Sequence, residues 1–246
     1  MRRILFFMIG IVSGIILYYF NINPILGFLI IVAVLVVCNG ITGYIISKLQ
    51  LKAFNSDCDP ELYLEMLNKQ EKRVHKNIRY INYLAINRAA GYLSLGEFQM
   101  AKECLEGIDT SYLSEKDGTY LVYTINLIGC YYEIGEIEKA ENLYETNLVR
   151  LSPFGKKLKK SVEILIGERY FYLEKYSLSY EHLNKLRNYD LNKRQYLGVL
   201  YLLAQMDVMN GVMDQAVVKF KKIAKLGNKL WIAKASQEML DTMKSI

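Results

Sequence analysis

The stretch YLSLGEFQMAKECL, residues 92–105, sets a pattern that recurs along the chain. Its counterparts are YYEIGEIEKAENLY from Tyr131, YFYLEKYSLSYEHL from Tyr170 and DVMNGVMDQAVVKF from Asp207. The central position of each copy falls at Gly96, Gly135, Glu174 and Gly211. These positions are 39, 39 and 37 residues apart, and a fixed period in this range indicates stacked supersecondary units. The sequence therefore predicts a repetitive all-α architecture.

Each recurring residue type has a physical role. A glycine between two helical patterns favours the left-handed conformation that ends a helix, so each copy is expected to be a helix-turn-helix unit. Glu174 replaces this glycine in the third copy, which predicts a looser or differently capped turn there. Small residues that let the paired helices approach, and bulky residues four positions later that fill the core, recur as Ala101/Leu105, Ala140/Tyr144, Ser179/Leu183 and Ala216/Phe220.

The pattern resembles the tetratricopeptide repeat, a helix-turn-helix unit of about 34 residues. The resemblance covers about residues 78–227 and is carried in the first copy by Ala89, Tyr92, Gly96, Phe98, Ala101 and Leu105. The spacing is longer than that of the family, and the closing proline is mostly missing, with Pro153 the nearest. The resemblance implies an α-solenoid of about four repeats, with residues 228–246 as a C-terminal capping helix.

The resemblance also implies a concave groove, lined by the first helix of each pair, that holds an extended peptide or a helix. Asn87 and Asn126 match the asparagines that grip ligands in many members. The neighbouring groove positions are mostly apolar or aromatic: Tyr83, Ile86, Ala90, Ile125, Gly129, Ile164, Phe171 and Tyr201. Such a groove favours an amphipathic helix over an acidic C-terminus. The alternative is that a neighbouring repeat, or the helix predicted at residues 60–74, already fills the groove.

Two apolar runs precede the repeats. Residues 4–20 and 24–47 carry no charge, and a bilayer core requires about 20 apolar residues in a helix. We expect two transmembrane helices joined by the turn NINP, which together form a hairpin over residues 1–50. A cleaved signal peptide is the alternative for the first run, but ILYYFNINP contains no small-x-small cleavage site. Residues 51–77 are expected to hold a junction and a first soluble helix, capped by Asp59 and Pro60.

Positive charges flank the hairpin and predict its orientation. They are Arg2, Arg3, Lys48 and Lys52, whereas the turn between the helices carries no charge. The positive-inside bias then places both termini and the soluble domain in the cytoplasm of a cell-membrane protein. Scattered cysteines, Cys58, Cys104 and Cys130, suit reduced thiols. The scarcity of proline and the abundance of Lys, Ile, Asn and Tyr are compatible with a bacterial source.

Small residues recur in both apolar runs, at Gly10, Gly14, Gly40 and Gly43. Small residues let membrane helices approach closely, so these glycines either pack the hairpin on itself or form a face for oligomerisation. The second alternative predicts a structural subunit of a larger membrane complex, a homo-oligomer included.

Motifs that carry chemistry are missing. His75 and His182 have no second histidine or cysteine pair at the spacing of metal ligands, and no phosphate-binding or nucleophile motif occurs. The acidic stretch EIGEIEKAE, residues 133–141, is interpreted as the solvated face of a helix. The sequence therefore predicts a non-enzymatic protein that needs no cofactor or metal.

The formal net charge is +6, and one basic group, Lys156, Lys157, Lys159 and Lys160, begins a predicted helix. A second group occupies VKFKKIAKLGNK, residues 218–229. Lysines beneath an anionic leaflet can orient a tethered domain, although an ordinary solvated face explains them equally well. We do not expect nucleic-acid binding, because no reading motif accompanies them. The sequence thus predicts a membrane-anchored scaffold or adaptor that binds a protein partner through a cytosolic groove.

Overall fold

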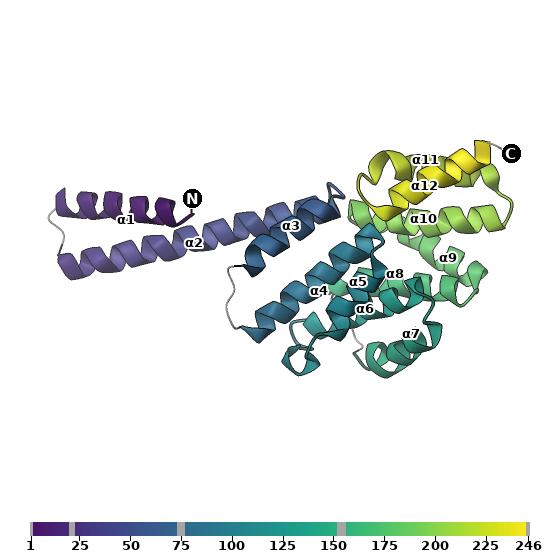
Figure 1. Ribbon diagram of the computed structural model, residues 1–246, viewed down its shortest axis with the longest axis horizontal. Helices are drawn as coiled ribbons and strands as arrows, with labels where there is room; N and C mark the ends of the chain where they lie inside the picture. The colour runs from purple at the N-terminus through teal and green to yellow at the C-terminus, as the bar shows by residue number, and fades with distance from the viewer. Residues whose placement is uncertain (1, 20–22, 73–76, 152–155, 245–246) are drawn as a thin grey trace. The chain divides into compact units, whose positions relative to one another are not determined.

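The computed structural model describes residues 2–19, 23–72, 77–151 and 156–244. Within these ranges every regular element is a helix, which confirms the predicted all-α class (Figure 1). The chain divides into two compact units, Met1–Leu51 and Lys52–Ile246, and each is described by itself.

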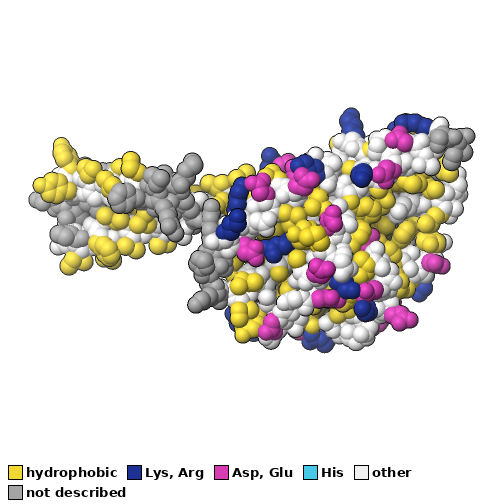
Figure 2. Space-filling model, in the orientation of Figure 1, with side chains coloured by type: hydrophobic (Ala, Val, Ile, Leu, Met, Phe, Trp, Pro, Cys, Tyr) yellow, Lys and Arg dark blue, Asp and Glu magenta, His cyan; other side chains and the backbone are white. Residues whose placement is uncertain are grey.

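The first unit contains helix α1 (Arg2–Tyr19) and most of helix α2 (Pro24–Asn55). Helix α2 is long and apolar enough to cross a membrane, a criterion that a signal sequence near the N-terminus also meets. Phe28 and Val36 are each 66% exposed, and the viewed face of this unit carries mainly hydrophobic side chains (Figure 2). The helix continues to Asn55, beyond the predicted end near residue 47. The spanning role of α1 and the hairpin stay predictions, and residues 20–22 of the turn region lie outside the described residues.

The second unit is built from ten α-helices and three short turns of 3-10 or π type in its described part. The α-helices after α2 are α3 (Pro60–Glu71), α4 (Ile78–Leu95), α5 (Phe98–Glu106), α6 (Thr119–Glu133), α7 (Ile137–Leu143), α8 (Lys156–Tyr172), α9 (Tyr176–Leu186), α10 (Lys193–Met209), α11 (Met213–Leu226) and α12 (Trp231–Lys244). The short turns are η1 (Thr110–Tyr112), η2 (Tyr144–Leu148) and η3 (Val149–Leu151). Helix α3 starts as predicted, because the Asp59 side chain accepts a hydrogen bond from the Leu62 N–H and Pro60 opens the helix.

The helices from α4 to α11 form four helix-turn-helix pairs: α4/α5, α6/α7, α8/α9 and α10/α11 (Figure 1). The first helices of successive pairs contact one another, as do α5 and α6, and α9 and α10. Helix α3 packs on α4 at one end of this series, and α12 packs on α11 at the other. The predicted end helix at residues 228–246 is therefore present as α12.

All four turns between paired helices have the same conformation. The turn residue takes a positive φ of 81° at Gly96, 78° at Gly135, 58° at Glu174 and 74° at Gly211. In each turn the N–H of this residue bonds the carbonyl three residues earlier, and the next N–H bonds the carbonyl five residues before itself. The expectation of a looser third turn was wrong: Glu174 makes the same bonds, since the helix end requires this geometry whichever residue occupies it.

The small residues of the pattern are buried between the paired helices. Ala101, Ala140, Ser179 and Ala216 are all fully buried. The Ser179 hydroxyl donates to the backbone carbonyl of Gly167 at 2.9 Å, so this polar atom has a partner inside the core. Of the bulky residues, Tyr144 alone is only half-buried. It begins the π-helical turn η2, and the Arg169 guanidinium lies 4.2 Å from its ring centroid.

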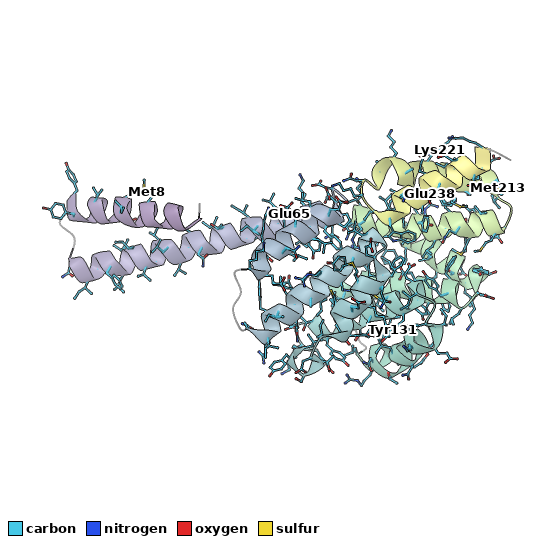
Figure 3. The ribbon with its side chains drawn as sticks, viewed as in Figure 1. Met8, Glu65, Tyr131, Met213, Lys221 and Glu238 are labelled. Atoms are coloured by element: carbon cyan, nitrogen blue, oxygen red, sulfur yellow. The ribbon has the colours of Figure 1, made fainter. Side chains whose placement is uncertain are left out.

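An ion pair replaces the aromatic residue of the fourth copy. Asp207 lies where the earlier copies have tyrosine, and its carboxylate pairs with the Lys219 ammonium from α11. Both residues are buried, and the Tyr180 hydroxyl also bonds Asp207. Lys219 therefore does not belong to the exposed basic stretch predicted for residues 218–229, because its charge is held inside the last helix pair. Lys221 of the same stretch is exposed on α11 (Figure 3).

Candidate functional site

A cavity of about 380 Å³ lies inside the second unit, on the face formed by the first helices of the last three pairs. Helices α6, α8 and α10 supply most of its lining, the α4–α5 turn region supplies one edge, and the start of α12 supplies a wall. Its apolar and aromatic lining includes Phe98, Ile125, Ile164, Phe171, Tyr201 and Trp231. Its polar lining includes Asn126, Glu133, Ser161, Glu168, Arg194, Gln195 and Gln205. A largely apolar cavity with a few convergent polar groups is the usual form of a ligand site.

Six of the ten predicted groove residues line this cavity: Ile125, Asn126, Gly129, Ile164, Phe171 and Tyr201. On α6, Ile125 and Gly129 are four residues apart, and on α8, Ile164 and Phe171 are seven apart, spacings that return to the same face of a helix. The amide of Asn126 donates to the backbone carbonyl of Ile86 at 3.4 Å, which ties α6 to α4. The surface of Gly129 is open, because a methyl group there would meet no described atom within 4 Å.

The other four predicted groove residues, Tyr83, Ile86, Asn87 and Ala90, lie on α4 outside the cavity. Ile86 is only 3% exposed, within the core shared by α4, α5 and α6. The amide of Asn87 donates to the Tyr83 carbonyl at 2.7 Å, and its oxygen accepts from the Tyr63 hydroxyl at 2.9 Å. The Asn87 side chain is therefore occupied within the chain and differs in this respect from the asparagine that the resemblance implied.

Helix α3 covers the α4 end of the predicted groove. Leu64 packs so closely on Gly91 that a methyl group there would lie 2.7 Å from the Leu64 Cδ2. Tyr63 stacks on Phe54 with ring centroids 4.3 Å apart, and both belong to a core that Ala90 contacts. The groove is thus divided: helix α3 covers much of the part beside α4, where Tyr83 stays exposed, and the part beside α6, α8 and α10 remains as a cavity.

The start of α12 forms the wall opposite. The Trp231 ring contacts Phe98 and Tyr201 edge to face, with centroids 5.5 and 5.2 Å away. The Lys229 ammonium pairs with the Glu61 carboxylate at 2.6 Å, and the Asn228 amide donates to the Asp57 carbonyl at 3.0 Å. The C-terminal loop is therefore bound to the beginning of α3, and the helix pairs enclose the cavity between the two ends of the unit.

Three charged side chains converge on the cavity: Glu133 from α6, Glu168 from α8 and Arg194 from α10. Burial and, to a smaller extent, the Glu133 carboxylate raise the pKa of Glu168 to about 7, against the opposing attraction of Arg194. Burial also raises the pKa of Glu133, while a hydrogen bond from the Tyr172 hydroxyl lowers it. Burial therefore favours the protonated form of both carboxylates.

Glu133 corrects the interpretation of residues 133–141 as a solvated helix face. Glu133 is half-buried and lines the cavity, whereas Glu141 is half-buried in a pair with Arg169, its carboxylate Oε2 2.6 Å from the Nη2 of that arginine. Glu168 and Arg194 were not predicted as site residues from the sequence. A signal for two of the three was present, because Glu133 and Glu168 lie four residues after Gly129 and Ile164, on the same predicted helix face.

The predicted lipid-facing lysines have different environments. Lys159 is exposed, and the Lys160 ammonium bonds the Asp190 backbone carbonyl and lies 3.4 Å from its carboxylate. Lys156 and Lys157 begin α8, and their side chains lie outside the described part. Acidic and basic side chains alternate over the viewed face of the second unit (Figure 2), which is not the single-sign patch of a nucleic-acid-binding surface.

The histidines and cysteines of the described part form no cluster typical of a metal site or a catalytic site. Among the described residues no three His, Cys, Asp or Glu side chains lie together as metal ligands. The ring of His182 is half-buried, with its Nε2 2.9 Å from the Glu163 carbonyl, and His75 lies outside the described residues. Cys58 and Cys130 are buried free thiols, and burial raises the pKa of Cys130 to about 12, which leaves it protonated at neutral pH.

The four glycines of the apolar helices have open surfaces. A methyl group added to Gly10, Gly14, Gly40 or Gly43 would meet no described atom within 4 Å. Both predicted roles of these glycines, packing within the hairpin and oligomerisation, stay predictions. Comparison of the whole chain with protein-family models, with curated proteins and with solved structures returned no match.

Proposed function

We propose that this chain is a membrane-anchored scaffold of tetratricopeptide-like repeats that binds a protein partner in the cavity between α6, α8 and α10. The cavity carries this proposal, because it combines aromatic walls with convergent polar groups on the face predicted to hold a ligand. A volume of about 380 Å³ accommodates a few side chains of a partner, not a whole helix. The partner would therefore insert anchor residues from a short segment.

The repeat assignment is supported by the four helix pairs with identical turn hydrogen bonds and by the buried small residue in each pair. Anchoring is supported by α2, whose length and apolar surface suit a bilayer. With the positive charges at the ends of the two apolar runs, we place the repeats in the cytoplasm. In this scheme the cavity selects the partner and the first unit holds it at the membrane.

Site-specific photo-crosslinking in intact cells tests the scaffold. Probes at Ile125, Ile164 and Phe171 face the cavity, and a probe at Leu178, which is 50% exposed on α9 and outside the cavity, is the matched control. We expect one protein to be captured from the cavity positions and not from Leu178. A variant that combines Ile125→Ser and Phe171→Ala should no longer capture this protein with the probe at Ile164. Capture that is equal at all four positions, or none from the cavity, would contradict the proposal.

A structural subunit that assembles through its membrane helices is the second candidate. The open surfaces of Gly10, Gly14, Gly40 and Gly43 favour it, because each leaves room for the close approach of another helix. Under this alternative Gly10→Ile disperses the assembly measured by native electrophoresis of the membrane extract, and the cavity substitutions have no effect. The scaffold predicts the reverse result for the two sets of variants.

A further inference from the structure

We propose that the cavity recognises a basic side chain of the partner, a lysine or arginine on an apolar stem, with the Glu168 carboxylate as its counter-charge. This inference rests on the proposed function and specifies the chemistry of the anchor residue. Three features of the cavity support it: a carboxylate without a partner, an arginine that is already occupied, and an aromatic lining.

Glu168 has an unsatisfied carboxylate. It is half-buried and lines the cavity, yet it makes no hydrogen bond and no ion pair with any described residue. A half-buried carboxylate without a protein donor is less favourable than a paired one, because part of its hydration is lost. A cationic donor that enters the cavity would supply the missing interaction.

Arg194 does not form the missing ion pair with Glu168. Its guanidinium lies over the Phe54 ring, with the Cζ atom 4.2 Å from the centroid, and its Nε is directed at the Asn55 oxygen at 3.5 Å. Arg194 attracts Glu168 through space but forms no direct ion pair with it among the described residues. Together with Glu133, the cavity lining therefore carries more potential negative charge than positive charge, which disfavours an acidic anchor.

The walls suit the rest of a basic side chain. Phe171, Tyr201 and Trp231 line the cavity, and aromatic faces attract ammonium and guanidinium groups while they also cover a methylene stem. Glu133, held by the Tyr172 hydroxyl, offers a second carboxylate from the neighbouring helix. A lysine or arginine thus finds both a counter-charge and an apolar surface.

The titratable groups around Glu168 set the pH dependence of binding. They are Glu133 from α6, Tyr172 from its own helix, and Arg194 and Tyr201 from α10; α4 and α12 contribute Ser94 and Trp231, which do not titrate. A cation binds the ionised form of Glu168, whose pKa is about 7 without ligand. Binding should therefore release a proton near neutral pH, and affinity should rise from pH 6 to pH 8.

Calorimetric titration of the full-length protein in zwitterionic nanodiscs tests the inference, with empty nanodiscs as blanks. The probes are the tripeptide Ac-Leu-Lys-Phe-NH2 and its analogues with Gln or Glu in the central position. We expect the Lys peptide to bind at least about tenfold more tightly than the Gln peptide at pH 8, with proton release detected in buffers of different ionisation enthalpy. Equal affinities, tighter binding of the Glu peptide, or no binding of the Lys peptide at millimolar concentration would overturn the inference.

Glu168→Gln should abolish the preference for Lys and the proton release, whereas Glu138→Gln, at an exposed position on α7, should change neither. The folded state of Glu168→Gln is checked by its unfolding temperature. Folding raises the pKa of Glu168 from 4.5 to about 7, so this group lowers stability progressively between these pH values and fully at pH 8, where the variant should be more stable than wild type. If crosslinking captures a partner that Glu168→Gln still binds, the scaffold stands and this inference fails. If the Lys peptide binds but no partner is captured, the scaffold fails, and only the preference of the cavity for a basic side chain stands.

Discussion

At the scale of single residues, Glu174 occupies a backbone position that three glycines occupy elsewhere in the chain. Its φ of 58° lies in the left-handed region, where a side chain with a Cβ atom is less stable than glycine. The surrounding hydrogen bonds are those of the glycine turns, so the helix pair imposes the conformation on Glu174. The third turn therefore carries a local strain that the other three lack.

Glu174→Gly should relieve that strain and raise the free energy of unfolding by about 0.5–1 kcal/mol, after the greater entropy of glycine in the unfolded chain is subtracted. Gly135→Ala is the matched opposite change, since a methyl group there meets no described atom and only the backbone conformation is disfavoured. It should lower the same free energy by about 1 kcal/mol. Urea denaturation of both variants measures the two effects. A loss of stability in Glu174→Gly would show that the glutamate side chain itself supports the turn.

At the scale of elements, the last helix pair contains a buried charge pair at the position where the earlier copies have a tyrosine. Tyr92, Tyr131 and Tyr170 are half-buried on the first helices of the earlier pairs, but Asp207 on α10 bonds Lys219 on α11. Burial of two charges is unfavourable unless each satisfies the other, so either charge alone would weaken the pair strongly.

Lys219→Met should therefore lower the free energy of unfolding by about 3 kcal/mol, because the Asp207 carboxylate would lose its counter-charge. The double change Asp207→Leu with Lys219→Met removes both charges and should recover most of that loss. Thermal unfolding followed by circular dichroism compares the single and the double variant. Equal destabilisation by both would mean that packing, and not charge, sets the energy of this helix pair.

At the scale of the second unit as a whole, residues distant in sequence enclose the cavity. The Trp231 ring contacts both Phe98, at the start of α5, and Tyr201, on α10 of the fourth helix pair. The neighbouring loop is bound to the start of α3 through Lys229 and Asn228. The two ends of the repeat series thus restrain one another, and the size of the cavity depends on both.

Trp231→Ala should remove this wall, with a loss of about 2–3 kcal/mol of unfolding free energy, since the tryptophan is only partly buried. Hydrogen exchange should become faster in α3 as well as in α12, because the restraint acts on both ends. Trp231→Phe keeps an apolar ring and should retain most of the protection. Faster exchange confined to α12 would contradict a coupling between the ends.

The sequence by itself determined the features that depend on neighbours along the chain. Helix pairs, turn positions, the small residues at Ala101 and Ala216, the Asp59 cap and the long apolar helix all follow from periodicity and local hydrogen bonding. Such patterns repeat within each copy, so they can be recognised without knowledge of the packing. Six of the ten predicted groove positions also share one surface for this reason.

The tertiary structure alone decided which part of that surface stays open. Only the packing of α3 on α4 places Tyr63 against Asn87, and only the return of α12 brings Trp231 to the cavity. Glu133, Glu168 and Arg194 come from three different helices and meet only when those helices stack. The physical reason is that burial and pKa values depend on every atom around a group, whereas periodicity reports only its place on its own helix.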